Sequence, residues 1–173
     1  MAAALKSNTS VVFFCAFENE FGDSGAEAFA TAIKSNATLV KLNLMYNEIG
    51  VAGAIAFADA IQSNSALEYF FLAGNSVGDS GAKAFADAIT SNATLKNLKL
   101  QENKISDVGG KTFVHALKVN STLTTLDFDG NFMCAATVAK IDALVTRNAS
   151  RPADAAEEVK AERLCRAGKL RNW

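Results

Sequence analysis

The sequence predicts an α/β fold, a short right-handed solenoid with a parallel sheet on its concave face and helices on its convex face. Apolar residues recur every 28 residues, an asparagine follows each apolar set, and a helical apolar stripe follows each asparagine. Such self-similarity is typical of solenoids, whose units bury their apolar faces against their neighbours. The apolar columns are Val11, Leu39, Leu67, Leu95 and Leu123; Phe14, Leu42, Phe70, Leu98 and Leu126; and Ala16, Leu44, Leu72, Leu100 and Phe128.

Each unit begins with a short strand. Its second and third apolar positions, such as Leu42 and Leu44, alternate with residues that point outward. An asparagine three residues later, such as Asn47, ends the strand, where its side chain can satisfy backbone groups that the strand leaves unpaired. Stacked copies of this asparagine should form a ladder. Its equivalents are Asn19, Asn75, Asn103 and Asn131.

Each strand is followed by a loop and a helix. In the second unit, Ala54, Phe57, Ala58 and Ile61 recur at helical spacing and form a buried stripe. Parallel strands lie about 4.8 Å apart, whereas packed helices need roughly 8 to 10 Å. The stack must therefore bend with its sheet on the inside. The outward helix positions are Ile55, Asp59 and Gln62.

The repeated pattern L-x-x-L-x-L-x-x-N, followed by a G-A-x-x-F helix and a second asparagine, resembles the leucine-rich repeats of the ribonuclease-inhibitor subtype. Ran GTPase-activating proteins and NOD-like receptors contain similar repeats. The resemblance covers residues 5 to about 150. It implies an arc that binds other proteins on its concave sheet and rims, with no chemistry of its own.

Length and composition indicate one elongated domain. We expect residues 1–10 to be the end of a preceding repeat helix or an N-terminal edge, residues 11–150 to be five repeats, and residues 151–173 to form a C-terminal helix and a basic tail. The formal net charge of −1 gives no electrostatic footprint for nucleic acid. The apolar runs are too short for a membrane span.

The N-terminus matches the tail of a repeat helix, because Leu5 and Asn8 correspond to Ile33 and Asn36. We therefore interpret it as part of a repeat and not as a signal peptide. The first strand, residues 11–17, is the most hydrophobic one, although solenoids normally cover such an end with a polar unit. Either a partner or a further repeat covers this edge, or the N-terminal segment folds over it.

The three cysteines, Cys15, Cys134 and Cys165, share no motif spacing. A disulfide scaffold or a zinc site is not expected, and reduced cysteines are typical of an intracellular compartment. Five Asn-x-Ser/Thr sequons occupy one position of the repeat. We expect this asparagine to serve as a left-handed helix C-cap rather than as a glycosylation site. The sequons are at Asn8, Asn36, Asn92, Asn120 and Asn148.

No catalytic constellation is recognisable in the sequence. The single histidine, His115, falls on the outward row of the helices and is not placed to act as a base. The glycines follow the repeat period and not a nucleotide-binding fingerprint. Acidic pairs such as Glu18 and Glu20 are expected to be exposed residues at a strand end. We therefore predict a protein that is not an enzyme and has no metal or other cofactor.

The outward positions of the strands vary between units and are free to carry function. The first column is Phe13, Lys41, Tyr69, Asn97 and Thr125; the second is Cys15, Asn43, Phe71, Lys99 and Asp127; the third is Phe17, Met45, Ala73, Gln101 and Asp129. We expect an exposed aromatic patch over the first three repeats and a polar surface over the last two, which suits an interface core. The alternative is that these rings pack among themselves or under the N-terminal edge.

These observations predict a protein-protein interaction module, an intracellular and cytoplasmic scaffold that binds a protein partner through the concave face, alone or within a larger complex. Two alternatives stay open: a regulator of a small GTPase, and a structural piece that docks through its N-terminal edge. The predicted partner contacts are Phe13, Phe17, Lys41, Asn43, Met45, Tyr46, Tyr69, Phe71, Lys99, Gln101 and Asp127.

The fifth unit loses its helix glycines after Asn131, although Val138, Ile141 and Val145 still supply an apolar helix face, so it should close the array. Pro152 is well placed to begin another helix. That helix is expected either to pack as a cap or to project into solvent. The basic stretch from Arg163 to Trp173 is interpreted as an anchor for a partner or as a mobile tail.

Overall fold

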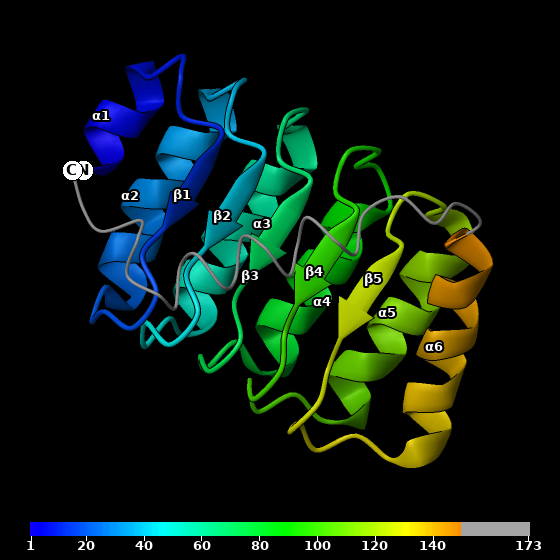
Figure 1. Cartoon of the computed structure of the whole chain (residues 1–173). Helices are drawn as coiled ribbons and strands as arrows, with labels where there is room; N and C mark the ends of the chain where they lie inside the picture. The colour runs from blue at the N-terminus through cyan, green and yellow to red at the C-terminus, as the bar shows by residue number, and fades with distance from the viewer. Residues whose placement is uncertain (150–173) are drawn as a thin grey trace.

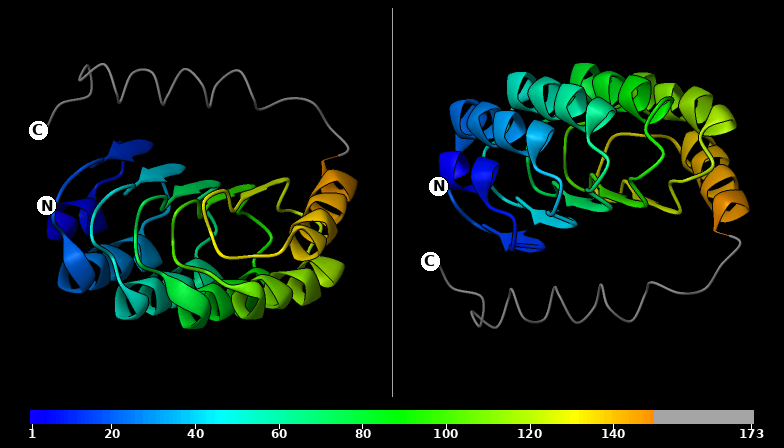
Figure 2. Two further views of the ribbon diagram at one scale, coloured as in Figure 1. Left: turned by 90° about the horizontal axis from the view of Figure 1, so that it is seen from below. Right: turned by 90° about the horizontal axis from the view of Figure 1, so that it is seen from above.

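Each 28-residue unit forms one strand and one helix in the computed structural model of the protein, which describes residues 1–149. The helices cover one face of a five-stranded sheet and stack side by side in chain order (Figures 1 and 2). The elements are α1 (Ala2–Ser7), β1 (Phe13–Cys15), α2 (Gly22–Ser35), β2 (Lys41–Asn43), α3 (Val51–Ser63), β3 (Tyr69–Phe71), α4 (Gly78–Ile89), β4 (Asn97–Lys99), α5 (Asp107–Val119), β5 (Thr125–Asp127) and α6 (Ala135–Asn148).

The sheet confirms the predicted register. All strand pairs are parallel in the order β1-β2-β3-β4-β5, and Phe14, Leu42, Phe70, Leu98 and Leu126 are successive partners. Alternate residues of a strand point to opposite faces of the sheet. The middle residue of every strand therefore faces the helices, and the two residues beside it face away from them.

The core lies between the sheet and the helices. The phenylalanine of the predicted helix stripe is buried in each of α2 to α5. In α2, α3 and α4 it packs against Phe14 or Phe70, the middle residue of a strand, and in α5 it packs against Phe128, just past β5. The Phe57 and Phe70 ring centroids lie 4.9 Å apart, and those of Phe70 and Phe85 lie 6.1 Å apart. Edge-to-face and tilted ring pairs contribute more than their buried area alone. This column therefore holds sheet and helices together across the repeat boundaries.

The asparagine after each helix links its unit to the preceding one. Asn92 Nδ2 donates to the carbonyls of Ile61 at 2.8 Å and Asn64 at 3.0 Å, while its Oδ1 accepts from the Leu95 N–H at 2.7 Å. Asn36, Asn64 and Asn120 repeat this arrangement. The prediction of a left-handed cap is wrong, because Asn36 has φ −79° and ψ 125° and the caps Asn64 and Asn120 are similarly extended. An extended backbone turns the amide toward the neighbouring unit.

The predicted ladder at the strand ends is confirmed. Asn75 Nδ2 donates to the Leu44 carbonyl at 3.1 Å in the preceding unit, and its Oδ1 accepts from the Ile49 N–H at 2.9 Å. Asn103 and Asn131 likewise donate to carbonyls 31 residues earlier in the chain, those of Leu72 and Leu100. Buried amides that bond at both ends are highly constrained, because a lost partner leaves a buried polar group unpaired. Two asparagine ladders thus run along the array, one at each end of the strands.

Aspartates in the first helical turn form a third link. Asp79 Oδ1 accepts from the N–H groups of Ser106 at 2.7 Å and Gly109 at 3.1 Å, and its Oδ2 accepts from Ser106 Oγ at 2.7 Å. Asp23 and Asp107 bond in the same way to the start of the next helix. A carboxylate at a helix N-terminus satisfies unpaired N–H groups and suits the helix dipole. The N-termini of α3, α5 and α6 are therefore capped by an aspartate of the preceding helix.

The two ends of the array differ. At the N-terminal end, α1 buries Leu5 against the core, yet Val12 is 58% exposed and β1 pairs only with β2 among the described residues. At the other end, Asn148 Nδ2 donates to the Asn120 carbonyl at 3.1 Å, and Arg147 Nη2 donates to the Leu117 carbonyl at 2.7 Å. That the fifth unit closes the array stays a prediction.

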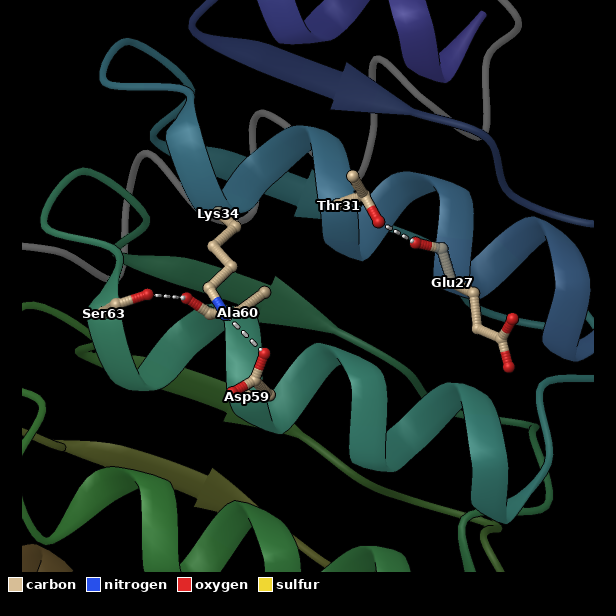
Figure 3. Close-up of polar contacts among 6 residues, drawn as sticks. All are labelled: Glu27, Thr31, Lys34, Asp59, Ala60 and Ser63. Atoms are coloured by element: carbon tan, nitrogen blue, oxygen red, sulfur yellow. Dashed lines mark hydrogen bonds and ion pairs between the residues drawn. The ribbon is translucent and has the colours of Figure 1, made fainter.

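The outer surface of the helices is polar and variable. Lys34 Nζ of α2 lies 2.7 Å from Asp59 Oδ2 of α3, while Thr31 and Ser63 donate to carbonyls of their own helices (Figure 3). The Lys34 and Asp59 side chains are 51% and 63% exposed, so this ion pair adds little to stability. None of the helices within residues 1–149 is long and apolar enough to cross a membrane.

The ladder predicts that Asn92→Ala is strongly destabilising. The change leaves buried carbonyl and N–H groups without partners, so the free energy of unfolding should fall by about 2 to 4 kcal/mol. The matched control is Asn8→Ala. Within residues 1–149 the Asn8 side chain accepts only local bonds, from the Ser10 N–H and Oγ and from the Val11 N–H, and its loss should cost about 1 kcal/mol or less. Urea unfolding followed by circular dichroism measures both, and equal losses would contradict the role of the inter-repeat bonds.

The aspartate link predicts a pH-dependent contribution to stability. Burial raises the pKa of Asp79, but the hydrogen bonds from Ser106 and Gly109 outweigh it and hold the pKa below its ordinary value of 3.8. A carboxylate with a lowered pKa stabilises the fold above the unfolded pKa and loses that effect as the pH falls through the folded pKa. Asp79→Asn should thus be less stable than wild type at pH 7, with the gap closing below about pH 4.

Ser106→Ala serves as the partial control, because it removes the hydroxyl donor and leaves the two N–H donors in place. At pH 7, Ser106→Ala should be less stable than wild type, but by a smaller free energy of unfolding than Asp79→Asn. Unfolding curves recorded from pH 2 to pH 7 test both variants. If the free energy of unfolding of Asp79→Asn differs from that of wild type by the same amount at every pH, the charge of the carboxylate does not contribute to stability.

Candidate functional site

The candidate site is the face of the sheet that points away from the helices. The pairing register aligns the two outward columns as predicted, with Phe13 beside Lys41 and Lys41 beside Tyr69 in the first. In the second, Asn43 lies beside Phe71 and Phe71 beside Lys99. The short repeat therefore brings residues that are 28 positions apart in the sequence into one continuous surface.

The predicted contact residues fall into three groups by exposure. Tyr46 is exposed at 38%, and Asn43, Met45, Tyr69 and Phe71 are buried. The remaining six are half-buried: Phe13, Phe17, Lys41, Lys99, Gln101 and Asp127. All of them lie on the concave face or its rim, as predicted. Their role in binding a partner stays a prediction.

The prediction that the aromatic patch is exposed is wrong at its centre. Met45, Tyr69, Phe71 and Ala73 form a small cluster of buried residues, separate from the main core, with Phe17 and Val40 packed beside it. Phe71 is only 1% exposed and Tyr69 only 4%. The alternative reading, in which these rings pack among themselves, describes these residues better. The sheet thus carries a second apolar cluster on its helix-free side.

Two lysines lie over the rings of this cluster. Lys41 Nζ lies 4.3 Å from the centroid of the Tyr69 ring, and Lys99 Nζ lies 5.2 Å from that of Phe71. An ammonium group over an aromatic face is attracted by the ring quadrupole, most strongly where water is excluded. The two lysines therefore combine positive charge with the apolar cluster on β2 to β4.

The C-terminal half of the face is polar, as predicted. Gln101 Nε2 donates to Asp127 Oδ2 at 2.5 Å, and Lys96 pairs with Glu68 at 2.9 Å. Two carbonyl oxygens stand out because no donor reaches them within residues 1–149: the buried Asn97 Oδ1 and Gln101 Oε1. Most buried polar atoms in proteins have partners. This half of the face can accept further hydrogen bonds.

A column with positive φ shapes the rim beside the strands, and the sequence analysis missed it. Glu18, Tyr46, Gly74, Glu102 and Gly130 all lie in the left-handed region, with φ between 52° and 73°. The left-handed turn places the Tyr46 ring against Gly74, and a Cβ on Gly74 would lie only 2.2 Å from Tyr46 Cδ1. The Phe17 and Tyr46 ring centroids are 5.4 Å apart. Gly74 and Gly130 were the only feature of the sequence that could have indicated the positive φ of this column, because glycine favours that conformation.

Tyr46 borders an open hollow of about 510 Å³. Three glutamates line it, Glu18, Glu20 and Glu48, together with Asn75 and Ser76. Among the described residues no group of histidine, cysteine, aspartate and glutamate side chains is arranged to hold a metal ion. The hollow is thus an acidic, partly aromatic recess on the rim of the concave face.

The cysteines differ from the prediction that all are reduced. Cys15, on the concave face of β1, is disulfide-bonded, whereas Cys134 is an exposed free thiol. The argument from reduced cysteines to an intracellular location therefore fails at Cys15, and that location stays a prediction. Cys165, the predicted helix after Pro152 and the basic tail lie outside the described residues.

Comparison with known families identifies the class of repeat. The model of the family described as Leucine Rich repeat matches residues 35–58, 63–86 and 91–114. Together with the parallel sheet and the alternating helices, this match shows that the protein is an α/β solenoid built from leucine-rich repeats. The ribonuclease-inhibitor subtype stays a prediction. No curated protein sequence matches the chain.

Solved structures of similar fold include two that match over nearly their whole length. One is titled leiomodin-1 actin-binding site 2, with a TM-score of 0.73, 17% identity, and coverage of 98% of this chain and 95% of that one. The other is the tropomodulin C-terminal domain of Caenorhabditis elegans, with a TM-score of 0.72, 14% identity, and coverage of 94% and 95%. At such low identity the likeness establishes the shared fold.

The geometry of the rim predicts different effects for two glycine substitutions. Gly74 and Gly78 have φ of +69° and +61°, so an alanine at either costs about 1 to 2 kcal/mol of backbone strain. An alanine at Gly74 must also displace the Tyr46 ring, whereas one at Gly78 meets only Val51 Cγ2 at 3.6 Å. Gly74→Ala should therefore be the more destabilising and should change the tyrosine near-ultraviolet circular dichroism. Identical spectra for the two variants would argue against the packing of Tyr46 on Gly74.

Proposed function

We propose that the protein is a non-catalytic protein-binding module that contacts its partner with the concave face of the sheet and the rim at Tyr46. The observation that carries this proposal is the contrast between the two sides of each strand. The inward column holds Phe14, Leu42, Phe70, Leu98 and Leu126, which are all large and apolar. Within each outward column the residue type changes from repeat to repeat. The packing of the repeats therefore does not determine which residues stand there.

The composition of the face suits a protein partner. Aromatic residues and methionine are enriched at the centres of protein interfaces, whose rims are polar. The Phe17 and Tyr46 pair, the lysines over Tyr69 and Phe71, and the acidic recess around Glu48 supply apolar area and charges of both signs. A partner would therefore meet an apolar and cationic centre beside an acidic rim.

The structural likeness suggests the first partner to test. One of the two similar structures is titled as an actin-binding site, and it aligns with nearly the whole of this chain. Because that likeness supports only the fold, actin enters as a proposal. We propose actin as the first candidate partner and a different protein, contacted through the same residues, as the second.

The proposal predicts that charge and ring changes on the face abolish binding. The double variant Tyr46→Ser, Lys99→Glu should weaken binding to purified actin at least tenfold, because residues at the centre of an interface contribute most of the binding energy. Both side chains are partly exposed, so the fold should persist, as circular dichroism can verify. The control Lys83→Glu on the convex side should bind like wild type.

A third variant separates the concave face from the N-terminal edge. Val12→Lys places a charge on the exposed start of that edge and should leave the affinity unchanged if the partner docks on the concave face. Affinity is measured by titration with labelled actin and, in parallel, by capture from cell extract. Capture can yield another protein where actin does not bind. If the double variant Tyr46→Ser, Lys99→Glu fails to bind that protein, the concave-face proposal holds with a partner other than actin. Equal capture by wild type and by the face variant would refute the concave-face proposal.

A further inference from the structure

The hollow beside Tyr46, called the rim recess from here on, is built by three successive repeats. The loops that follow β1, β2 and β3 all contribute to it. Its volume of about 510 Å³ falls within the roughly 300 to 1,000 Å³ of pockets that hold small ligands. The recess is therefore large enough for one long side chain of a partner. Its lining includes Glu18, Glu20, Tyr46, Glu48, Gly74 and Ser76.

The tyrosine ring of the rim recess is held in place. Tyr46 has φ 54°, and its ring lies so close to Gly74 that a Cβ there would collide with it. The Phe17 ring meets the Tyr46 ring edge-on, with the centroids 5.4 Å apart and an angle of 79° between the planes. Tyr46 is nevertheless 38% exposed. Because the ring is already ordered, a ligand that stacks on it loses little affinity to side-chain ordering.

The charge of the rim recess is negative. Glu18, Glu20 and Glu48 are exposed, and none of them forms a salt bridge within residues 1–149. One ammonium group lies at the edge, where Lys104 Nζ donates to Ser76 Oγ at 2.9 Å. The carboxylates still outnumber it, and they attract a further cation. Among the described residues no acidic group is arranged to hold a metal ion, so an organic cation is the fitting occupant.

A buried acceptor under one wall of the recess independently indicates a hydrogen-bond donor. Asn47 is fully buried, and its Oδ1 accepts no hydrogen bond from the described residues. The residue lies under the loop after β1, because its Nδ2 donates to the Ala16 carbonyl at 2.8 Å and its own carbonyl accepts from the Gly22 N–H at 3.0 Å. The equivalent Asn75 Oδ1 accepts from two N–H groups. Most buried polar atoms have partners, so this side of the recess can accept a further donor.

An arginine side chain fits these features better than a lysine. Its guanidinium group is planar, stacks on aromatic rings and carries five N–H donors in a fixed fork that matches carboxylates. Arginine is also the more frequent partner in cation–π pairs. A lysine ammonium is a compact, strongly hydrated charge that cannot lie flat on a ring while it donates to carboxylates on two sides. One guanidinium group can stack on Tyr46 and donate to the glutamates around it.

We propose that the rim recess binds an arginine side chain of the protein partner, with the guanidinium group stacked on Tyr46 and paired with Glu48 and its neighbouring glutamates. This inference deepens the proposed function and rests on it for the existence of the partner. The recess itself can be tested without any partner, because a small arginine derivative carries the same guanidinium group.

The first test measures binding of three matched probes to the full-length chain. N-acetylarginine methylamide is titrated while the backbone amide signals of Glu48 and Gly74 are followed by nuclear magnetic resonance. We expect saturable shifts that are confined to the loops of the recess. N-acetyllysine methylamide has the same charge and should bind about threefold more weakly. N-acetylcitrulline methylamide has nearly the same shape without the charge and should not bind. Equal binding of arginine and lysine, or of arginine and citrulline, would overturn the proposal.

The second test assigns binding to the recess. Glu48→Gln removes one charge and keeps the shape of the side chain, so it should weaken the arginine probe about threefold, as expected for an exposed ion pair. Tyr46→Ser removes the ring and should weaken it about threefold as well. The matched control Glu27→Gln, an exposed position on the convex side in α2, should bind like wild type. Unchanged binding in Glu48→Gln, or an equal loss in Glu27→Gln, would show that the probe does not occupy the recess.

A partner measurement then separates the two proposals. Glu48→Gln should also weaken binding of actin, or of the protein captured in its place. If the arginine probe binds in the recess but no protein binds the concave face, the proposed function fails and the arginine site stands. If a partner binds Glu48→Gln as tightly as wild type while Lys99→Glu loses it, the proposed function stands and the arginine inference is refuted.

Discussion

The structure depends on buried asparagine amides that join each repeat to the one before it. An Asn92 side chain makes bonds to two carbonyls of the preceding unit and to N–H groups of its own turn. No unit of 28 residues could bury a core of its own, because one strand and one helix have too little apolar surface. The amides fix how the units stack, and the phenylalanine column then fills the space between them. Both depend on the same period.

This dependence explains which features the sequence could predict. The period, the strand register and the apolar stripe follow from packing that is repeated in every unit, so five copies confirm one another. The inward residues such as Leu42 and Phe57 were predicted correctly for this reason. The left-handed turn at Tyr46 was missed because only Gly74 and Gly130 of its column are glycines. The other three residues, Glu18, Tyr46 and Glu102, have the same positive φ but are residue types that do not predict it.

The site was less predictable than the fold. Its residues were placed on the correct face, since strand alternation requires it, but their burial was not. Exposure of Phe71 depends on what lies over the sheet, and nothing in the periodicity describes that. The bonded state of Cys15 is a similar case, because the repeat period carries no information about it. Repetition thus predicts the scaffold, whereas the unrepeated residues decide what the scaffold does.

The reach of the asparagine ladders has a consequence for how such a chain can change in evolution. The amides of Asn36, Asn64, Asn92 and Asn120 bond to carbonyls 28 and 31 residues earlier, and those of Asn75, Asn103 and Asn131 bond to a carbonyl 31 residues earlier. A duplication or loss of one whole unit gives every amide in the array an equivalent set of partners, so the gene can grow or shrink by 84 nucleotides at a time. An insertion of a single codon within a strand instead shifts the amides on both sides of it away from their carbonyls. Selection should therefore admit length changes in whole units and confine smaller ones to loops outside the ladders.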